Sequence, residues 1–358
     1  MSAVEDLLAI AAIPAPTMAE EARAEWLAAR LEGLPGRRRR DAVGNLIWEW
    51  GEGRPRVLLA AHLDTVFPAE TPLEFRRDGD DLIGPGVGDN AAAVAVAVEV
   101  VAELLEERAL APGAVAFTVG EEGLGNLRGA LHACRELAPE AFVALEGHML
   151  ETVVVDAVGS VRARVSVSAP GGHSWSDRGQ PSAIHELVAV ASALLAMSAA
   201  EAPVNVGTIS GGRSVNTLAD RAELVVECRS ISQRALDRFE AELAELAVGP
   251  GCELAVEPLG RRPGGSLPRD SQLFAAIAAV REELGLPLEL GAASTDANAA
   301  HALGVPALCI GVAAGSGMHS LGERIDLATM ATGAAQLRAL LLALLAEKTE
   351  SGASARPG

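Results

Sequence analysis

Short apolar runs alternate with helical patterns in the first third of the chain. The apolar runs indicate buried strands, and the segments between them repeat apolar residues at helical spacing. The predicted elements are strands at 57–61, 114–119 and 142–145 and helices at 91–106 and 125–135. Such alternation is typical of an α/β layer built on a mostly parallel sheet.

The pattern changes after Asp156, where apolar residues alternate with others at every second position, as in a strand with one buried face. The elements predicted here are a strand at 161–168, a helix at 182–197, strands at 204–209 and 222–229, a helix at 235–247 and a strand at 253–257. This β-α-β-β-α-β order is the ferredoxin-like α+β arrangement.

The first pattern returns after Ser271 and predicts a helix to Leu284, a strand at 307–311 and a helix at 326–346. The α/β segments therefore flank the α+β segment on both sides. A chain of 358 residues is long enough for two domains, so the smaller domain is predicted to be inserted into the larger one.

Glycine and proline gather near 157–160 and 262–268, where we expect the two connections between the domains. The first domain is therefore predicted to comprise residues 1–157 and 268–358. The inserted domain is predicted to comprise residues 158–267.

The chain carries 29 Lys and Arg against 48 Asp and Glu, a formal net charge of −19. This balance argues against nucleic acid or an anionic membrane as a partner. The one basic run, Arg37–Arg40, is interpreted as a solvated strand edge. Glu99 and Arg338 interrupt the most apolar stretches, so we expect no membrane span. The acidic start lacks the positive leader of a signal peptide, so we expect a cytoplasmic protein.

Charged or histidine residues follow several of the predicted strands. His62 and Asp64 stand two apart at the end of the strand at 57–61, so both side chains lie on one side. A nearby carboxylate can fix the tautomer of a metal-binding histidine. A hydrogen-bonded surface histidine is the alternative.

Further carboxylates occupy similar positions. Asp89 follows a Gly-rich loop and precedes an Ala/Val helix, where it is either a helix cap or a ligand. Glu121 and Glu122 follow the strand at 114–119, and two like charges there are costly unless a cation or a shared proton relieves them. The simplest interpretation is that one of the two glutamates is a metal ligand and the other a general base. An exposed acidic turn is the alternative.

Glu146 follows the strand at 142–145, and His319 lies in a Gly-rich loop far downstream. These positions share the edge of the sheet where open α/β folds bind ligands. Two histidines with three or four carboxylates suit Zn²⁺ or a similar cation, and one bridging carboxylate would allow two metals.

On these motifs the chain resembles the M20 family of metallopeptidases and amidohydrolases, which includes glutamate carboxypeptidases, acetylornithine and succinyl-diaminopimelate deacylases and peptidase T-like aminopeptidases. The resemblance covers essentially the whole chain. It rests on an ordered set of motifs: His62-x-Asp64, Gly86-x-Gly88-Asp89-Asn90, Glu121-Glu122-Gly123, Glu146, Gly171-Gly172-His173-Ser174 and His319.

The resemblance implies a zinc-peptidase-like catalytic domain with a central mixed, mostly parallel sheet, and it makes the inserted domain a lid and dimerisation domain. It also implies two divalent metal ions, zinc in the first place and cobalt or manganese as alternatives. Asp89 matches the carboxylate that bridges both metals. His62 and Glu146 match the other ligands of one metal, and Glu122 and His319 those of the second.

The remaining roles also follow from the resemblance. Glu121 matches the general base that deprotonates the metal-bridging water, and Asp64 matches the carboxylate that orients His62. His173 matches the lid histidine that reaches the active site of the partner subunit. Asn216 and Arg229 match positions that bind the substrate.

The resemblance implies a cis peptide bond between Asp89 and Asn90. The sequence departs from the family pattern where Trp175 replaces a small residue and where Leu218 and Ala219 replace Ile-Pro. Both departures concern substrate choice and leave the predicted metal centre intact.

The implied reaction is hydrolysis of an amide bond in a short peptide or an N-acyl amino acid by a homodimer, with no nucleic-acid or membrane partner. The segments 294–298 and 304–306 resemble peptidase T-like members, which favours a peptidase over an N-acyl-amino-acid deacylase. The alternative of another class is a non-catalytic dimeric binding or scaffold protein. Such relatives usually lack the base or a ligand, and none is missing here.

Overall fold

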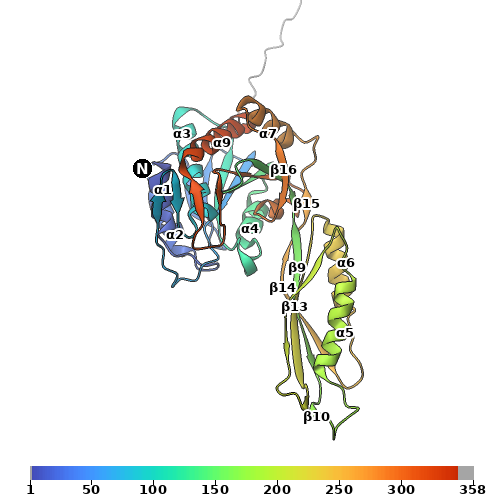
Figure 1. Ribbon diagram of the computed structural model, residues 1–358. Coiled ribbons are helices and arrows are strands. Elements are labelled where there is room, and N and C mark those ends of the chain that lie inside the picture. The colour runs from blue at the N-terminus through green and yellow to red at the C-terminus, as the bar shows by residue number, and fades with distance from the viewer. Residues whose placement is uncertain (1, 346–358) are drawn as a thin grey trace, which may run out of the picture.

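The apolar run predicted at 57–61 becomes a central strand of a mixed sheet in the computed structural model, which describes residues 2–345 (Figure 1). The strands of this sheet are β1 (Arg37–Arg40), β2 (Leu46–Trp50), β3 (Val57–His62), β6 (Gly113–Thr118), β7 (Ala141–Glu146), β8 (Thr152–Ala157), β15 (Gly265–Ser266), β16 (Glu289–Ala293) and β17 (Ala307–Gly311). Their order is β1-β2-β6-β3-β7-β17-β8-β15, with β16 paired to β8. The central strands β6, β3, β7 and β17 run parallel, which confirms the predicted α/β fold with a mixed sheet.

Helices cover both faces of this sheet. They are α1 (Ala3–Ala11), α2 (Glu21–Arg30), α3 (Ala93–Glu107), α4 (Arg128–Leu137), α7 (Gln272–Glu283), α8 (Ala297–His301) and α9 (Met330–Leu345), with 3₁₀ turns at Gly123–Gly125 and Leu327–Thr329. Successive β3 side chains point to opposite faces. Leu59 therefore belongs to the core formed with α1, α2, α3, α7 and α9, whereas Leu58 belongs to the core formed with α4 and α8.

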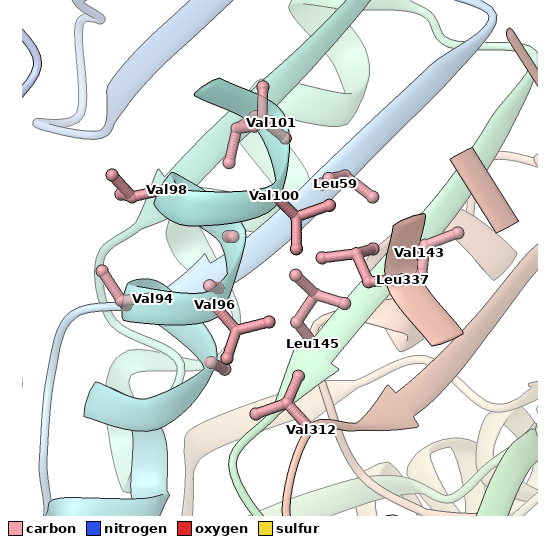
Figure 2. Close-up of a cluster of buried hydrophobic side chains, with 14 of the residues drawn as sticks. Leu59, Val94, Val96, Val98, Val100, Val101, Val143, Leu145, Val312 and Leu337 are labelled. Atoms are coloured by element: carbon pink, nitrogen blue, oxygen red, sulfur yellow. The ribbon is translucent and has the colours of Figure 1, made fainter. Parts of the chain in front are cut away.

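The larger core is built from small branched side chains. Figure 2 shows Val96 and Val100 of α3 directed toward Leu59, Leu145 and Leu337, which come from two strands and α9. Each such buried side chain contributes about 1.5–3 kcal/mol to folding. The core fixes the strands whose carboxyl ends carry the candidate site.

One apolar segment is longer than expected. The segment Leu327–Leu345 is long and apolar enough to cross a membrane by length and composition, although Arg338 was expected to interrupt it. Its buried side chains, including Leu337, Leu340 and Leu341, belong to the hydrophobic core. Arg338 on the same helix forms ion pairs with Glu103 and Glu107 of α3. The segment is therefore a packed core helix of this fold.

A separate antiparallel sheet lies in the second part of the molecule, which extends away from the first in Figure 1. It consists of β9 (Gly159–Ser168), β11 (Val204–Gly211), β13 (Arg221–Ser230) and β14 (Glu253–Arg262), in the order β11-β13-β9-β14. Helices α5 (Ala183–Ala196) and α6 (Gln233–Ala244) pack on one face of it. This is the predicted ferredoxin-like order, and we call this four-stranded sheet with its two helices the lid.

Two smaller sheets were not predicted. At the far end of the lid, β10 (Gly172–His173) pairs with β12 (Thr217–Leu218). Beside the large mixed sheet, β4 (Arg76–Asp78), β5 (Asp81–Ile83), β18 (Gly315–Ser316) and β19 (Arg324–Asp326) form a sheet in the order β18-β19-β5-β4. The turn between β18 and β19 carries His319.

The basic run Arg37–Arg40 forms β1 at an edge of the large sheet, as expected. Arg37 and Arg39 both form ion pairs with Glu49 on the neighbouring strand. The run is therefore accounted for by cross-strand pairing at a solvated edge.

Candidate metal centre

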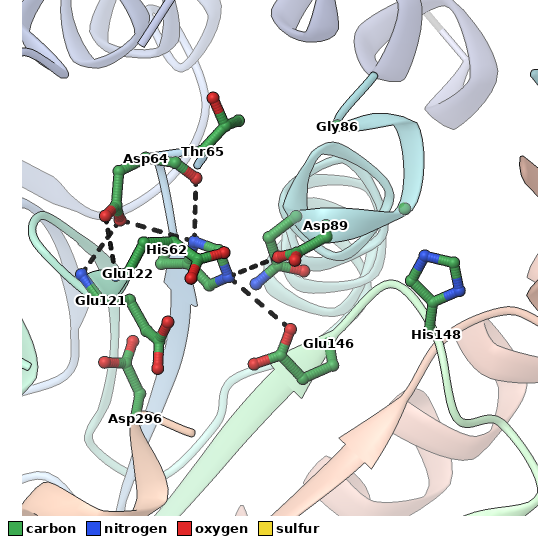
Figure 3. A network of polar contacts seen from close by, with 12 residues as sticks. His62, Asp64, Thr65, Gly86, Asp89, Glu121, Glu122, Glu146, His148 and Asp296 are labelled. Atoms are coloured by element: carbon green, nitrogen blue, oxygen red, sulfur yellow. Dashed lines mark hydrogen bonds and ion pairs between the residues drawn. The ribbon is translucent and has the colours of Figure 1, made fainter. Parts of the chain in front are cut away.

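The predicted ligands come together at the carboxyl ends of the parallel strands. His62 ends β3, Glu146 ends β7, and Glu121 and Glu122 follow β6 after two residues. Asp89 lies in the turn Val87–Ala92 that precedes α3. Figure 3 shows these side chains directed toward one another. The parallel register of β6, β3 and β7 explains why residues far apart in sequence meet here.

Asp89 lies between the two histidines. Its Oδ1 is 2.9 Å from His62 Nε2, and its Oδ2 is 3.0 Å from His319 Nε2. His62 Nε2 also lies 3.7 Å from Glu146 Oε2, and His319 Nε2 lies 3.2 Å from Glu122 Oε1. Two groups therefore share one carboxylate: His62, Asp89 and Glu146 on one side, and Asp89, Glu122 and His319 on the other.

His62 is held with its Nε2 facing the centre. Its Nδ1 lies 3.0 Å from the backbone carbonyl oxygen of Asp64, so Nδ1 donates the hydrogen bond and Nε2 keeps a lone pair for a metal. The Asp64 carboxylate lies 3.5 Å from the same Nδ1. It accepts hydrogen bonds from the backbone N–H groups of Glu121 and Glu122 at 3.0 and 2.8 Å. Asp64 therefore positions both the imidazole and the loop of paired glutamates.

The electrostatics of the centre favour a cation. Burial raises the pKa of Glu122 to about 8, and the charges of Asp89 and Glu121 add to the rise. Burial likewise raises the pKa of Glu146 to about 7, against the effect of His62. Carboxyl groups that resist ionisation at neutral pH are stabilised as anions by a bound metal ion. The nitrogen and oxygen donors fit Zn²⁺, Mn²⁺ or Co²⁺.

Glu121 is grouped with His62 and Glu122, but it belongs to neither group that includes Asp89. Its carboxylate is buried, and Arg262 Nη1 donates a hydrogen bond to its Oε1 at 3.0 Å. Burial raises the pKa of Glu121 to about 7, against the lowering effect of Arg262 and His62. Asp296 lies on the same side of the centre (Figure 3) and accepts a hydrogen bond from Thr118 Oγ1 at 2.5 Å. A carboxylate whose pKa lies near neutrality can accept and return a proton.

Glu323 fixes the turn that carries Asp89 through hydrogen bonds to its backbone. The buried Glu323 carboxylate accepts hydrogen bonds from the backbone N–H groups of Gly86, Gly88 and Asp89 at 2.6, 3.0 and 2.7 Å. His148 Nε2 lies 2.7 Å from the same carboxylate. A Cβ on Gly88 would lie 2.2 Å from that Nε2, so only glycine fits there. The Asp89–Asn90 peptide bond is cis, as expected.

Replacing Glu323 by glutamine is expected to weaken metal retention by about 10- to 100-fold, as the loss of a group that orients a ligand usually does. The glutamine amide would turn an N–H₂ group toward backbone N–H donors, so the Asp89 turn would shift. Chelator competition would measure metal affinity. Glu103→Gln, a change on α3 away from the centre, is the matched control. Equal metal affinity in the variant and the wild type would contradict this role.

The other predicted residues lie in two places. Arg229 of β13 lines the cavity of about 440 Å³ that also contains His62, Asp89 and Glu121, together with Arg162. His173 and Asn216 instead lie exposed at the far end of the lid, where the Ser174 N–H donates to the Asn216 carbonyl oxygen at 3.0 Å. The structure therefore brings Arg229 to the centre and keeps His173 and Asn216 outside the cavity of their own chain.

His173 is held in one tautomer. The backbone N–H groups of Trp175 and Ser176 point to its Nδ1 at 3.2 and 3.3 Å. Nδ1 is therefore the acceptor, which leaves the proton of the neutral ring on Nε2 as a hydrogen-bond donor.

Three residues of the centre were not predicted, namely Arg262, Asp296 and Glu323. Arg262 lies in the predicted hinge at 262–268, and Asp296 lies in the segment 294–298 that was compared only with peptidases. Glu323 follows His319 by four residues. No local pattern distinguishes these positions, because each acts through contacts with a distant segment.

A further group of metal-binding side chain types lies elsewhere, at Asp41, His132 and Glu136. Arg39 Nη2 lies 2.8 Å from Glu136, and the Asp41 Oδ1 atom accepts three backbone hydrogen bonds. These contacts account for the group as a surface ion-pair network.

Comparisons with known proteins agree with this geometry. The sequence pattern of peptidase family M20/M25/M40 matches residues 58–343. A Mycobacterium tuberculosis protein named as a succinyl-diaminopimelate desuccinylase, DapE, is 28% identical over 80% of this chain and 82% of its own length. A [LysW]-lysine hydrolase of Deinococcus radiodurans is 26% identical over 93% and 95% of the two chains. The crystal structure of aminopeptidase PepT from Bacillus cereus has a TM-score of 0.78 and 20% identity, and the match covers 96% of this chain and 98% of that chain.

Proposed function

The chain belongs to peptidase family M20/M25/M40 and is a metal-dependent hydrolase of amide bonds. We propose that its substrates are short peptides with a free carboxylate. One observation carries this proposal. The cavity of about 440 Å³ is lined both by the acidic centre and by Arg162 and Arg229. A substrate that spans the cavity would present its amide to the centre and its carboxylate to an arginine.

Arg229 is the arginine proposed to bind this carboxylate. Its side chain is 46% exposed, and its Nε donates a hydrogen bond to Glu227 at 2.9 Å. The pairing with Glu227 orients the guanidinium, whose planar donors suit a carboxylate. Arg162 donates from its own Nε to the other oxygen of Glu227 at 2.7 Å and thereby fixes the same carboxylate.

The two groups that share Asp89 would hold two divalent metal ions, and zinc is the metal we propose. When bound, the ions would polarise the amide carbonyl and make a nearby water more acidic. Glu121 is proposed to take the proton of the attacking water and to donate it to the leaving nitrogen. This carboxylate is buried and accepts a hydrogen bond from Arg262 Nη1.

Residues 158–267 are proposed to act as a lid and as the dimerisation domain of a cytoplasmic homodimer. Exposed apolar side chains on α5 and on the edge strand β11, among them Val188, Leu195 and Ile209, support such an interface. The Nε2–H of the exposed His173 supports a role as a donor to the oxyanion in the partner's active site. Asn216, which is hydrogen-bonded beside it, is proposed to contact the same substrate.

The proposal is tested with a substrate panel on metal-free enzyme and on enzyme loaded with Zn²⁺, Mn²⁺ or Co²⁺. The panel contains di- and tripeptides, the same peptides with a carboxyl-terminal amide, and N-acetyl and N-succinyl amino acids. We expect hydrolysis of free peptides only after metal loading. We expect amidated peptides to lose about 10- to 100-fold in kcat/KM, the effect of one charge-assisted hydrogen bond.

Two outcomes would contradict this assignment. Faster hydrolysis of the N-acyl amino acids would identify a deacylase, the activity that the name of the Mycobacterium relative favours. A well-folded dimer that binds no metal and hydrolyses nothing in the panel would indicate a scaffold protein.

A further inference from the structure

The lid contributes an arginine to the catalytic centre of its own chain. Arg262 is the last residue of β14, and its side chain is only 6% exposed. Its Nη1 donates to Glu121 Oε1 and to Ser294 Oγ, each at 3.0 Å, and its Nη2 donates to the backbone carbonyl oxygen of Glu121. A buried guanidinium is costly unless it is paired, and here both terminal nitrogens are engaged by protein atoms.

The loop that carries Glu121 is held by the lid a second time. Arg162 of β9 donates from Nη1 to the backbone carbonyl oxygen of Gly123 at 2.9 Å. Strands β9 and β14 are neighbours in the lid sheet, with Arg262 opposite Ser160 and Gly260 opposite Arg162. Two arginines at one end of the lid sheet therefore contact the same loop, residues 121–123.

The connections between the lid and the large sheet run beside these contacts. Asn298 Nδ2 donates to the carbonyl oxygens of Val158 and Pro263, at 3.0 and 2.8 Å, one on each connection. Glu121 follows β6 of the large sheet, whereas Arg262 ends a strand of the lid. Any rotation of the lid about these connections therefore changes the contact between Arg262 and Glu121.

We propose that Arg262 is a positioning residue that holds the Glu121 carboxylate in the orientation needed for proton transfer and makes that orientation depend on the lid. This inference rests on the proposed role of Glu121 as the base. Oε1 is fixed by the guanidinium, so the carboxylate cannot turn freely about its last torsion and Oε2 keeps one direction. Ser294 fixes the guanidinium in turn.

A role in substrate binding fits Arg262 less well. Both arginines line the cavity, but Arg229 is about half exposed, whereas Arg262 is buried with two nitrogens engaged by Glu121 and Ser294. A substrate-binding arginine affects mainly KM, and a residue that positions the base affects mainly kcat. The two roles therefore give opposite kinetic results.

Arg262→Ala is the principal test, measured on metal-loaded enzyme with a short peptide substrate. We expect kcat to fall about 10- to 100-fold, the cost of a misplaced catalytic group, while KM stays within about threefold. Bound metal, measured by mass spectrometry, should be unchanged. Added methylguanidinium should restore part of the lost kcat, since it can occupy the space of the deleted group beside Glu121.

Arg261→Ala is the matched control, because Arg261 is adjacent on β14 and pairs with Asp237 and Glu240 on the lid surface. Its kcat and KM should equal those of the wild type. Arg262→Lys keeps the charge but loses the fork of donors, and it should give an intermediate kcat. This variant also carries the test if Arg262→Ala does not fold.

The inference is overturned if folded Arg262→Ala or Arg262→Lys keeps the kcat of the wild type, or if KM rises while kcat is unchanged. An equal increase of kcat by methylguanidinium in Arg261→Ala would also overturn it. Glu121→Gln separates this failure from failure of the proposed function. If Glu121→Gln remains active, the base has been assigned wrongly, whereas an inactive Glu121→Gln with an unaffected Arg262→Ala refutes only the positioning role.

Discussion

Replacing Glu121 by glutamine is expected to reduce kcat by about 10²–10⁴-fold, the usual contribution of general acid–base catalysis, with bound metal unchanged. The glutamine keeps the size of the side chain and can still accept the hydrogen bond from Arg262 Nη1. It cannot take up a proton at neutral pH. Turnover of a short peptide and metal content by mass spectrometry are measured on the same preparation.

Glu122→Gln is the matched comparison, because the two glutamates are adjacent and both are hydrogen-bonded through their backbone to Asp64. Glu122 Oε1 lies 3.2 Å from His319 Nε2 within a ligand group, so this variant should lose metal affinity. A loss of metal in Glu121→Gln, or activity within about tenfold of the wild type, would contradict the assignment of the base.

The sequence predicted the large elements because their patterns are local. The apolar runs at β3, β6, β7 and β17 and the alternation along β9 each reflect one strand with a defined burial. Strands such as β8 and β16 were missed. Strand β8 has only a short fully buried run, and β16 has no buried residue, so neither shows the pattern of a core strand.

The same distinction applies to the site. The predicted ligands end strands, and the parallel sheet brings strand ends together, so sequence and topology sufficed to group His62, Asp89, Glu122, Glu146 and His319. The groups that support them act differently. Glu323 reaches the Asp89 turn from more than 230 positions along the chain, and no periodic pattern records such a contact.

His173 is a predicted site residue that lies outside the site of its own chain. It belongs to β10, which lies at the far end of the lid in Figure 1, it is exposed, and the cavity of its own chain does not include it. Two backbone N–H groups nevertheless donate to its Nδ1, which leaves Nε2–H as the donor of the neutral ring. A ring held in one tautomer on an exposed turn is suited to donate a hydrogen bond to a group on another molecule.

Removing this donor should cost a large fraction of the rate. His173→Ala is expected to lower kcat by about 10²–10³-fold with metal retained, the effect of losing one oxyanion donor. Trp175→Ala leaves the ring in place and is the neighbouring control. Because Trp175 is 72% exposed beside His173, its loss should alter the preference among substrate side chains more than the rate with the smallest peptides. A rate for His173→Ala close to that of the wild type would exclude the donor role.

Mixing the two inactive variants distinguishes action within a chain from action across a dimer. A heterodimer of His173→Ala and Glu121→Gln has one site with an intact Glu121 that faces an intact His173 of the other subunit. Random exchange makes half of the dimers mixed, each with one working site of two, so about a quarter of the wild-type activity should return. If His173 served its own chain, every site would lack either the base or the donor. Confirmed subunit exchange without recovered activity would therefore exclude action across the dimer.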